Sequence, residues 1–184
     1  MKLLNEKILD LKALYVKELR VLLSAEEMIA IKTQYLADSA ADRGLVDTLE
    51  NQVEESEARA KRLREILQHV GDEVQPVKCK VVYALFDDAE DIIKNAEPDG
   101  VRDAAVLAAA QRVKHFEIAS YGSVREFARA LERKQEAELL DEAVYDEGRA
   151  ELALAKIGER INPVAGPKNS LNVQDGDRTK LENR

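Results

Sequence analysis

Residues 101–122 read VRDAAVLAAAQRVKHFEIASYG, and this stretch decides the fold class. It is rich in alanine, the best helix former, and contains no proline. A charged segment, Lys114-His115-Phe116-Glu117, interrupts the middle of this apolar helix. Alanine lets neighbouring helices approach closely. The stretch therefore predicts a packed helix with polar side chains at its centre, and raises the question of what those side chains do.

The composition of the whole chain also indicates an all-α protein. Of its 184 residues, 45% are apolar, 35% are charged and only 4% are aromatic. The net charge of −8 argues against nucleic acid as a partner, because a phosphate backbone needs a basic surface. The single cysteine, Cys79, excludes an intramolecular disulfide and a thiolate metal site. No stretch has signal-peptide or transmembrane length, so we expect a cytoplasmic protein with no membrane partner.

Apolar residues recur at helical spacing through most of the chain. The spacing predicts four long helices at about 3–41, 45–70, 100–133 and 135–161, and a shorter helix at about 78–95. Asp99 is the expected N-cap of the third long helix, and Pro163 is expected to end the fourth. One long connection between the second and third long helices is typical of a ferritin-like four-helix bundle. We expect a helical domain at 1–162 and a flexible tail at 163–184.

Carboxylates fall within or beside the apolar stripes of these helices. Glu18 and Glu26 lie in the stripe of the first helix, and Glu55 lies at the edge of the second. On the fourth, Asp146 lies in the stripe and Glu142 at its edge. A carboxylate inside a bundle must be paired, protonated or bound to metal, because a lone buried charge is costly. A salt bridge is the alternative to a metal ligand at each position.

In the third long helix, His115 and Glu117 flank the apolar stripe on opposite sides. The flank of Glu117 is the more apolar, which makes Glu117 the better inward ligand and His115 a hydrogen-bonding or secondary candidate. With Glu18 or Glu26, Glu55 and Glu142, Glu117 completes a set of one carboxylate per helix. Such sets bind iron or manganese in di-metal bundles. The Glu-x-x-His pattern of those proteins is absent, so an empty site is the alternative.

The stretches LLSAEEM at 22–28, VRDAAVLAAAQRVKHFEIASYG at 101–122 and AELLDEAV at 137–144 resemble the bacterial YciE/YciF family of ferritin-like, stress-associated proteins. The resemblance covers about 15–161. It implies a ferritin-like fold, a homodimer and a role in the stress response. The recurrent polar residues of that family fall on Glu26, Glu55, His115, Glu117, Tyr121 and Glu142.

The chain departs from the family pattern at five polar positions, occupied here by Gln52, Arg59, Tyr83, Lys114 and Asp146. Arg59 is the most unfavourable for metal, because its guanidinium is always charged and repels divalent cations. We therefore hypothesise that Arg59 and Asp146 form a buried ion pair in place of one metal.

The sequence supports two functional interpretations. The protein is either a stress-associated bundle with a degenerate or partly retained metal site, or an active di-iron or di-manganese protein that handles peroxide or oxidises metal. In the second case Tyr121 or Tyr15 is a candidate redox or hydrogen-bonding group near the metals. In the first, Leu107, Ile118 and Tyr121 lie away from the main stripe and predict a partner surface.

Overall fold

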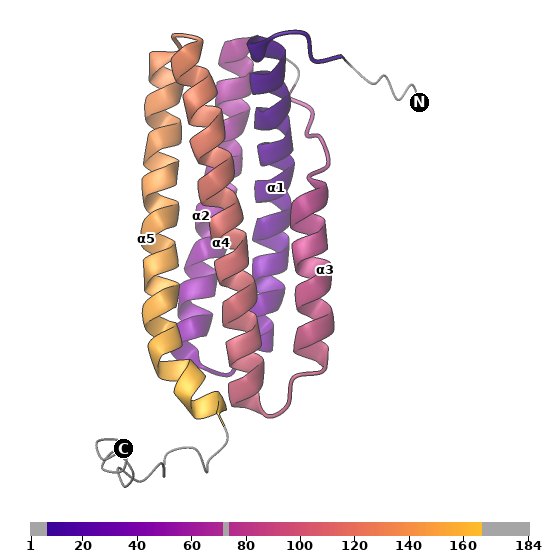
Figure 1. Ribbon diagram of the computed structural model, residues 1–184, viewed down its shortest axis with the longest axis vertical. Helices are drawn as coiled ribbons and strands as arrows, with labels where there is room; N and C mark the ends of the chain where they lie inside the picture. The colour runs from indigo at the N-terminus through magenta and orange to yellow at the C-terminus, as the bar shows by residue number, and fades with distance from the viewer. Residues whose placement is uncertain (1–6, 72–73, 167–184) are drawn as a thin grey trace, which may run out of the picture.

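The computed structural model describes residues 7–71 and 74–166. They form five helices and no strand: α1 (Leu11–Ser39), α2 (Arg43–Val70), α3 (Lys80–Lys94), α4 (Asp99–Ala130) and α5 (Lys134–Ala165). Figure 1 shows α1, α2, α4 and α5 as the four long, nearly parallel rods of a bundle, with the shorter α3 at one side. The predicted all-α bundle with an extra helix in its long connection is confirmed.

The helices pack as two hairpins, α1 with α2 and α4 with α5. Helix α3 lies against both α1 and α4 and covers that side of the bundle. On the opposite side, between α2 and α5, the described residues include no covering helix, and the packing is looser. None of the described helices combines the length and the apolar character required to cross a membrane.

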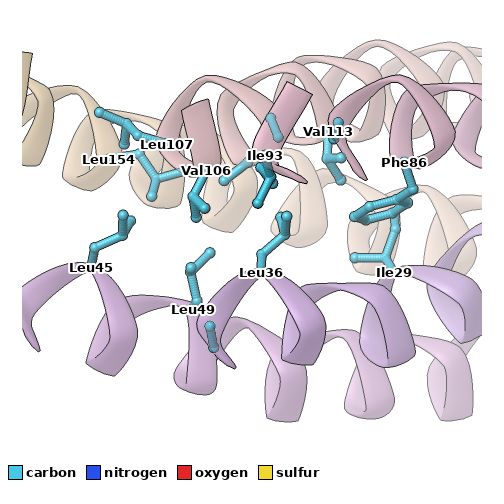
Figure 2. Packing of buried hydrophobic residues seen from close by; sticks show 14 of the residues in the cluster. Ile29, Leu36, Leu45, Leu49, Phe86, Ile93, Val106, Leu107, Val113 and Leu154 are labelled. Carbon is cyan, nitrogen blue, oxygen red and sulfur yellow. The ribbon is translucent and has the colours of Figure 1, made fainter. Parts of the chain in front are cut away.

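Two apolar clusters fill the bundle at different heights. One contains Ile29 and Leu36 of α1, Leu45 and Leu49 of α2, and residues of α3, α4 and α5 that face them (Figure 2). The other surrounds the α4–α5 turn, with Tyr15, Leu19, Leu63, Tyr121 and Leu140 among its members. The stretch between the two clusters holds most of the buried charged side chains of the bundle.

The short link between α1 and α2 is held by a buried carboxylate on α4. Asp103 accepts hydrogen bonds from the backbone nitrogens of Ala41 (2.7 Å) and Asp42 (3.2 Å). Arg102, its neighbour, donates to the carbonyl of Ser39 at 3.1 Å. These contacts give backbone groups of the link hydrogen-bond partners on α4. They also fix the α1–α2 hairpin against α4.

Three predicted helix boundaries are wrong. Helix α1 begins at Leu11 rather than near position 3, because Asp10 caps it by accepting from the Ala13 nitrogen at 2.8 Å. Asp99 is the first residue of α4, and Pro98 occupies the N-cap position. Helix α5 continues through Pro163 to Ala165.

Pro163 lacks the backbone N–H that would bond one turn back, but it lies in the last turn of α5, so only two helical residues follow the distortion it causes. The end of α5 also packs against the start of α4: a Cβ at Gly100 would lie 3.9 Å from the Ala165 backbone. The helix therefore extends three residues past the boundary predicted for the domain. Of the predicted tail, 167–184 lie outside the described residues.

The predicted partner surface on 101–122 is also wrong. Leu107 and Tyr121 are buried, and Ile118 is half-buried. Leu107 fits against α5 at Gly158, where an added Cβ would lie 3.1 Å from Leu107 Cδ2. A residue off the main stripe is buried here because α4 contacts α1, α3 and α5 at once. The neighbouring helices therefore bury more of the α4 surface than its apolar stripe predicts.

Candidate metal centre

A group of charged side chains lies inside the bundle between the two apolar clusters. Each of the four long helices contributes at least one member, and every member is between 0 and 7% exposed. We call this group the central cluster; it consists of Glu26 of α1, Arg59 of α2, Lys114 and Glu117 of α4, and Glu147 of α5.

Lys114 bridges two carboxylates of the central cluster. Its Nζ lies 2.7 Å from Glu117 Oε2, one turn along α4, and 2.7 Å from Glu147 Oε2 on α5. Burial by itself lowers the pKa of the Lys114 ammonium, but the two carboxylates raise that pKa above its usual value. Lys114 is therefore a charged ammonium ion inside the bundle.

Arg59 contacts all three carboxylates of the cluster. Its Nη2 lies 2.8 Å from Glu147 Oε1 and 3.9 Å from Glu117 Oε1, and its Nε lies 3.4 Å from Glu26 Oε1. Its Nη1 lies 3.7 Å from Glu55 Oε2 at the edge of the cluster. One guanidinium thus links α2 to α1, α4 and α5.

Tyr121 donates a hydrogen bond to one of the two carboxylate oxygens of Glu26. Its hydroxyl donates to Glu26 Oε1 at 2.8 Å, and both side chains are buried. The other oxygen, Glu26 Oε2, accepts no hydrogen bond from the described residues. Burial raises the pKa of the Glu26 carboxyl, and the nearby Arg59 opposes that shift. The Glu26 carboxylate thus has one oxygen bonded to Tyr121 and one buried oxygen, Oε2, with no donor among the described residues.

The cluster holds three carboxylates and two cations, so one carboxylate charge is unbalanced. Burial raises the pKa of Glu117 to about 7, against the opposing effect of the Lys114 ammonium. Burial and the neighbouring Glu117 raise the pKa of Glu147 to about 7 as well. A proton shared among these acids would neutralise the surplus charge, since like charges at close range resist joint ionisation.

The structure brings together two of the residues expected as metal ligands, Glu26 and Glu117. Glu55 lies at the margin, with its side chain 51% exposed. Glu142 is exposed and its Oε2 lies 3.4 Å from Arg62 Nη1. His115 is 68% exposed and its Nε2 lies 3.7 Å from Glu151 Oε1 on the outer surface. Glu18 is half-buried outside the cluster. Neither Glu142 nor His115 reaches the central cluster.

The α5 carboxylate of the cluster is Glu147, which the sequence analysis missed. The expected ion pair between Arg59 and Asp146 is wrong: Asp146 is exposed, and Arg59 contacts Glu147 instead. The two adjacent positions lie about 100° apart round the helix, so a stripe rotated by one position exchanges them. The spacing of Leu140, Ala143, Glu147 and Leu154, at intervals of three, four and seven, is the signal that places Glu147 inward.

Lys114 departs from the family pattern and is not among the residues expected inside the bundle. It lies four residues after Ala110 and three before Glu117, both buried, so the same helical rule places it inward. A lysine is normally assigned to the surface, because burying its charge without a partner is costly. The partners of Lys114 are Glu117, one turn along the same helix, and Glu147, whose position on α5 only the tertiary structure shows.

A groove between α2 and α5 leads to the central cluster from solvent. Its volume is about 440 Å³, and it is lined by Gln52, Glu55, Arg59, Arg62, Asp146 and Arg149 together with small side chains. Gln52 is 3% exposed, and its Nε2 has no hydrogen-bond partner among the described residues. Three of the lining residues of α5 are alanines, at 143, 150 and 153, which leave this side of the bundle open.

The carboxylates of the cluster suit a metal, but its cations do not. One oxygen each of Glu26, Glu117 and Glu147 lie within 4.8 Å of one another, and such oxygen donors suit iron or manganese. Lys114 and Arg59, however, already lie at ion-pair distances from these carboxylates. Two positive side chains in this space would repel a pair of divalent cations. The residues present therefore do not fit a di-metal centre.

A four-helix bundle with one long crossover and a carboxylate from several helices at its centre defines the ferritin-like class of proteins. Over residues 10–163 the sequence matches the family described as "Domain of unknown function (DUF892)". The chain belongs to this family. Protein YciF of Escherichia coli (strain K12) is 30% identical to it over 135 residues, which are 73% of this chain and 81% of YciF.

Two solved structures share the fold. The crystal structure of the E. coli stress protein YciF matches with a TM-score of 0.81 and 26% identity, covering 85% of this chain and 99% of that one. YcfI from Rhodopseudomonas palustris matches with a TM-score of 0.79 and 26% identity, covering 82% of this chain and 96% of that one. The resemblance to YciF expected from the sequence is thus confirmed.

Proposed function

We propose that this protein is a stress-associated ferritin-like protein whose carboxylate centre is degenerate and which works without metal redox chemistry. One observation carries the proposal: Lys114 and Arg59 lie among the three buried carboxylates and pair with them. A metal would have to displace the Lys114 ammonium from two contacts of 2.7 Å and would still face the guanidinium of Arg59.

The named relatives are compatible with a non-catalytic role. YciF is a stress protein, and YcfI has been proposed to be a structural protein. We extend a stress role to this chain and propose that it acts as a cytoplasmic homodimer, through association rather than catalysis. Exposed apolar side chains on one face of α5, Tyr145 and Leu152, offer a contact for such an association.

The alternative function is an active di-iron or di-manganese protein that handles peroxide or oxidises metal. The three converging carboxylates and the hydroxyl of Tyr121 beside Glu26 favour it. The two proposals differ in whether the central cluster binds metal, so metal content distinguishes them directly.

The test is metal analysis of protein expressed in iron- and manganese-rich medium and purified without chelator. We expect iron and manganese far below one ion per chain, and no difference between the wild type and Glu117→Ala. Glu159→Ala, at an exposed position, serves as the matched control. Stoichiometric metal that is lost in Glu117→Ala but kept in Glu159→Ala would establish the metalloprotein instead.

A second measurement tests the stress role. In a strain of the native host that lacks this protein, we expect the wild type and Glu117→Gln to restore survival under stress equally. A requirement for the Glu117 carboxylate in a variant that folds normally would contradict a role independent of the metal ligands.

A further inference from the structure

We infer that Lys114 and Arg59 take the place of cations in an otherwise intact carboxylate site, and that neutralising both side chains creates a site for a divalent cation. This inference rests on the proposed function, because it assumes that the wild-type cluster carries no metal.

The position of Lys114 is the first support. Its Nζ lies at 2.7 Å from one oxygen each of Glu117 and Glu147, so a single positive charge bridges carboxylates from α4 and α5. Lys114 is 1% exposed and both carboxylates are 0% exposed. The ammonium therefore supplies the charge that would otherwise have to come from a bound cation, since two buried carboxylates cannot stay ionised side by side without one.

Arg59 supplies the second positive charge. Its guanidinium contacts Glu147 at 2.8 Å and Glu26 at 3.4 Å, and so joins α5 to α1 across the bundle. Without these two side chains, three buried carboxylates would face one another with no balancing charge. That arrangement is the one in which a hard divalent cation binds.

The carboxylates themselves are already placed for a cation. One oxygen each of Glu26, Glu117 and Glu147 lie within 4.8 Å of one another, and all three side chains are fully buried. Glu26 Oε2 accepts no hydrogen bond from the described residues and is available as a ligand. Tyr121 holds the other oxygen of Glu26 at 2.8 Å and fixes the carboxylate.

A path for the cation is also present. Arg59 forms part of the wall of the groove between α2 and α5, whose volume is about 440 Å³. Replacing Arg59 with the shorter glutamine would open the groove toward the carboxylates without adding a charge. A hydrated divalent cation could then enter from the side that α3 does not cover.

The experiment compares the full-length double variant Lys114→Gln/Arg59→Gln with the wild type at neutral pH, with and without Mn²⁺. In the variant we expect about one Mn²⁺ per chain by equilibrium dialysis and metal analysis. We expect Mn²⁺ at hundredfold excess over its Kd to raise the Tm by roughly 5–10 °C, and chelator to reverse the rise. The wild type should show neither effect.

Two further variants complete the test. Arg43→Gln/Lys61→Gln makes the same change in net charge at exposed positions and should bind no Mn²⁺. Adding Glu117→Gln to the first double variant should abolish binding. If the double variant folds only when Mn²⁺ is present, the inference is also supported, because the metal then replaces the lost charges.

The inference is overturned if the double variant folds and shows neither bound Mn²⁺ nor a rise in Tm. It is equally overturned if Mn²⁺ rescues the folding of neither this variant nor Lys114→Gln alone. Both results differ from failure of the proposed function, which would appear as stoichiometric metal in the wild type.

Discussion

Lys114 of α4 and Glu147 of α5 form a fully buried ion pair, with 2.7 Å between Nζ and Oε2. The pair lies between two apolar clusters, and both side chains are at most 1% exposed. Such a pair adds little net stability compared with well-packed apolar residues, but removing one partner leaves an uncompensated buried charge. The interior of this bundle therefore depends on its charges being matched.

Lys114→Met tests this dependence, since methionine keeps much of the side-chain volume and removes the charge. We expect the free energy of unfolding to fall by about 3–5 kcal/mol at neutral pH, because Glu117 and Glu147 lose their shared partner. Urea denaturation monitored by circular dichroism measures the change.

The control for this variant is Lys156→Met, on the exposed side of α5, which should change the unfolding free energy by no more than about 0.5 kcal/mol. The double variant Lys114→Met/Glu147→Gln should be more stable than the sum of the two single effects predicts. Strict additivity would show that Lys114 and Glu147 do not interact.

Stability should fall as pH rises through the neutral range. The pKa values of Glu117 and Glu147 are about 7 in the folded protein, against a usual value of 4.5. A raised carboxyl pKa means that the folded state holds a proton which the unfolded state has already released. The contribution of these raised pKa values to the free energy of unfolding is complete below about pH 4.5, and it is lost progressively as the pH rises to about 7. Thermal melts between about pH 5 and 8 measure it.

Glu147→Gln should flatten this pH profile, because it removes one of the three carboxylates and leaves the two cations balanced. Asp146→Asn, at the adjacent exposed position, should keep the profile of the wild type. A profile flattened by the Asp146 substitution instead would mean that the wrong α5 carboxylate has been placed in the cluster.

Tyr121→Phe tests the hydrogen bond to Glu26. The substitution removes the hydroxyl that lies 2.8 Å from Glu26 Oε1 and leaves a buried carboxylate oxygen with one donor fewer. We expect a loss of about 1–3 kcal/mol in unfolding free energy. Tyr145→Phe, at an exposed position on α5, should change it by less than about 0.5 kcal/mol. Equal effects of the two substitutions would rule out a role for the buried hydroxyl.

Asp103→Ala tests how the α1–α2 link is held. Asp103 is the acceptor for the backbone nitrogens of Ala41 and Asp42, and alanine offers no replacement. We expect a loss of about 1–3 kcal/mol and faster hydrogen exchange of these two amides, measured by NMR. Asp91→Ala, exposed on α3, is the matched control. Unchanged exchange at Ala41 and Asp42 would show that the link is held by other contacts.

The helical fold could be predicted from the sequence because its signals are local. Alanine-rich, proline-free stretches and apolar spacing of three and four residues identify each long helix without reference to the others. The long connection before residue 101 likewise indicates the crossover. Exact ends were less predictable, since Asp10 and Pro163 act through capping and packing that a spacing rule does not include.

The candidate site was predictable only in part. Glu26 and Glu117 were recognised because a carboxylate within or close beside an apolar stripe is conspicuous. On α5 the sequence points to Asp146 instead of Glu147, because the stripe expected for this helix is rotated from its buried face by one position, about 100°. Arg59 was placed inward correctly, but its partner was not.

The sequence by itself determined that this chain folds as an all-α bundle with acidic residues on inward faces, since these follow from residue spacing along one helix. The tertiary structure alone decided which charges meet. Lys114 and Glu147 are 33 residues apart in sequence, and their contact depends on how α4 and α5 pack. Whether a buried carboxylate meets an ammonium, a guanidinium or an open space is a property of several helices together. That packing makes this centre a cluster of ion pairs.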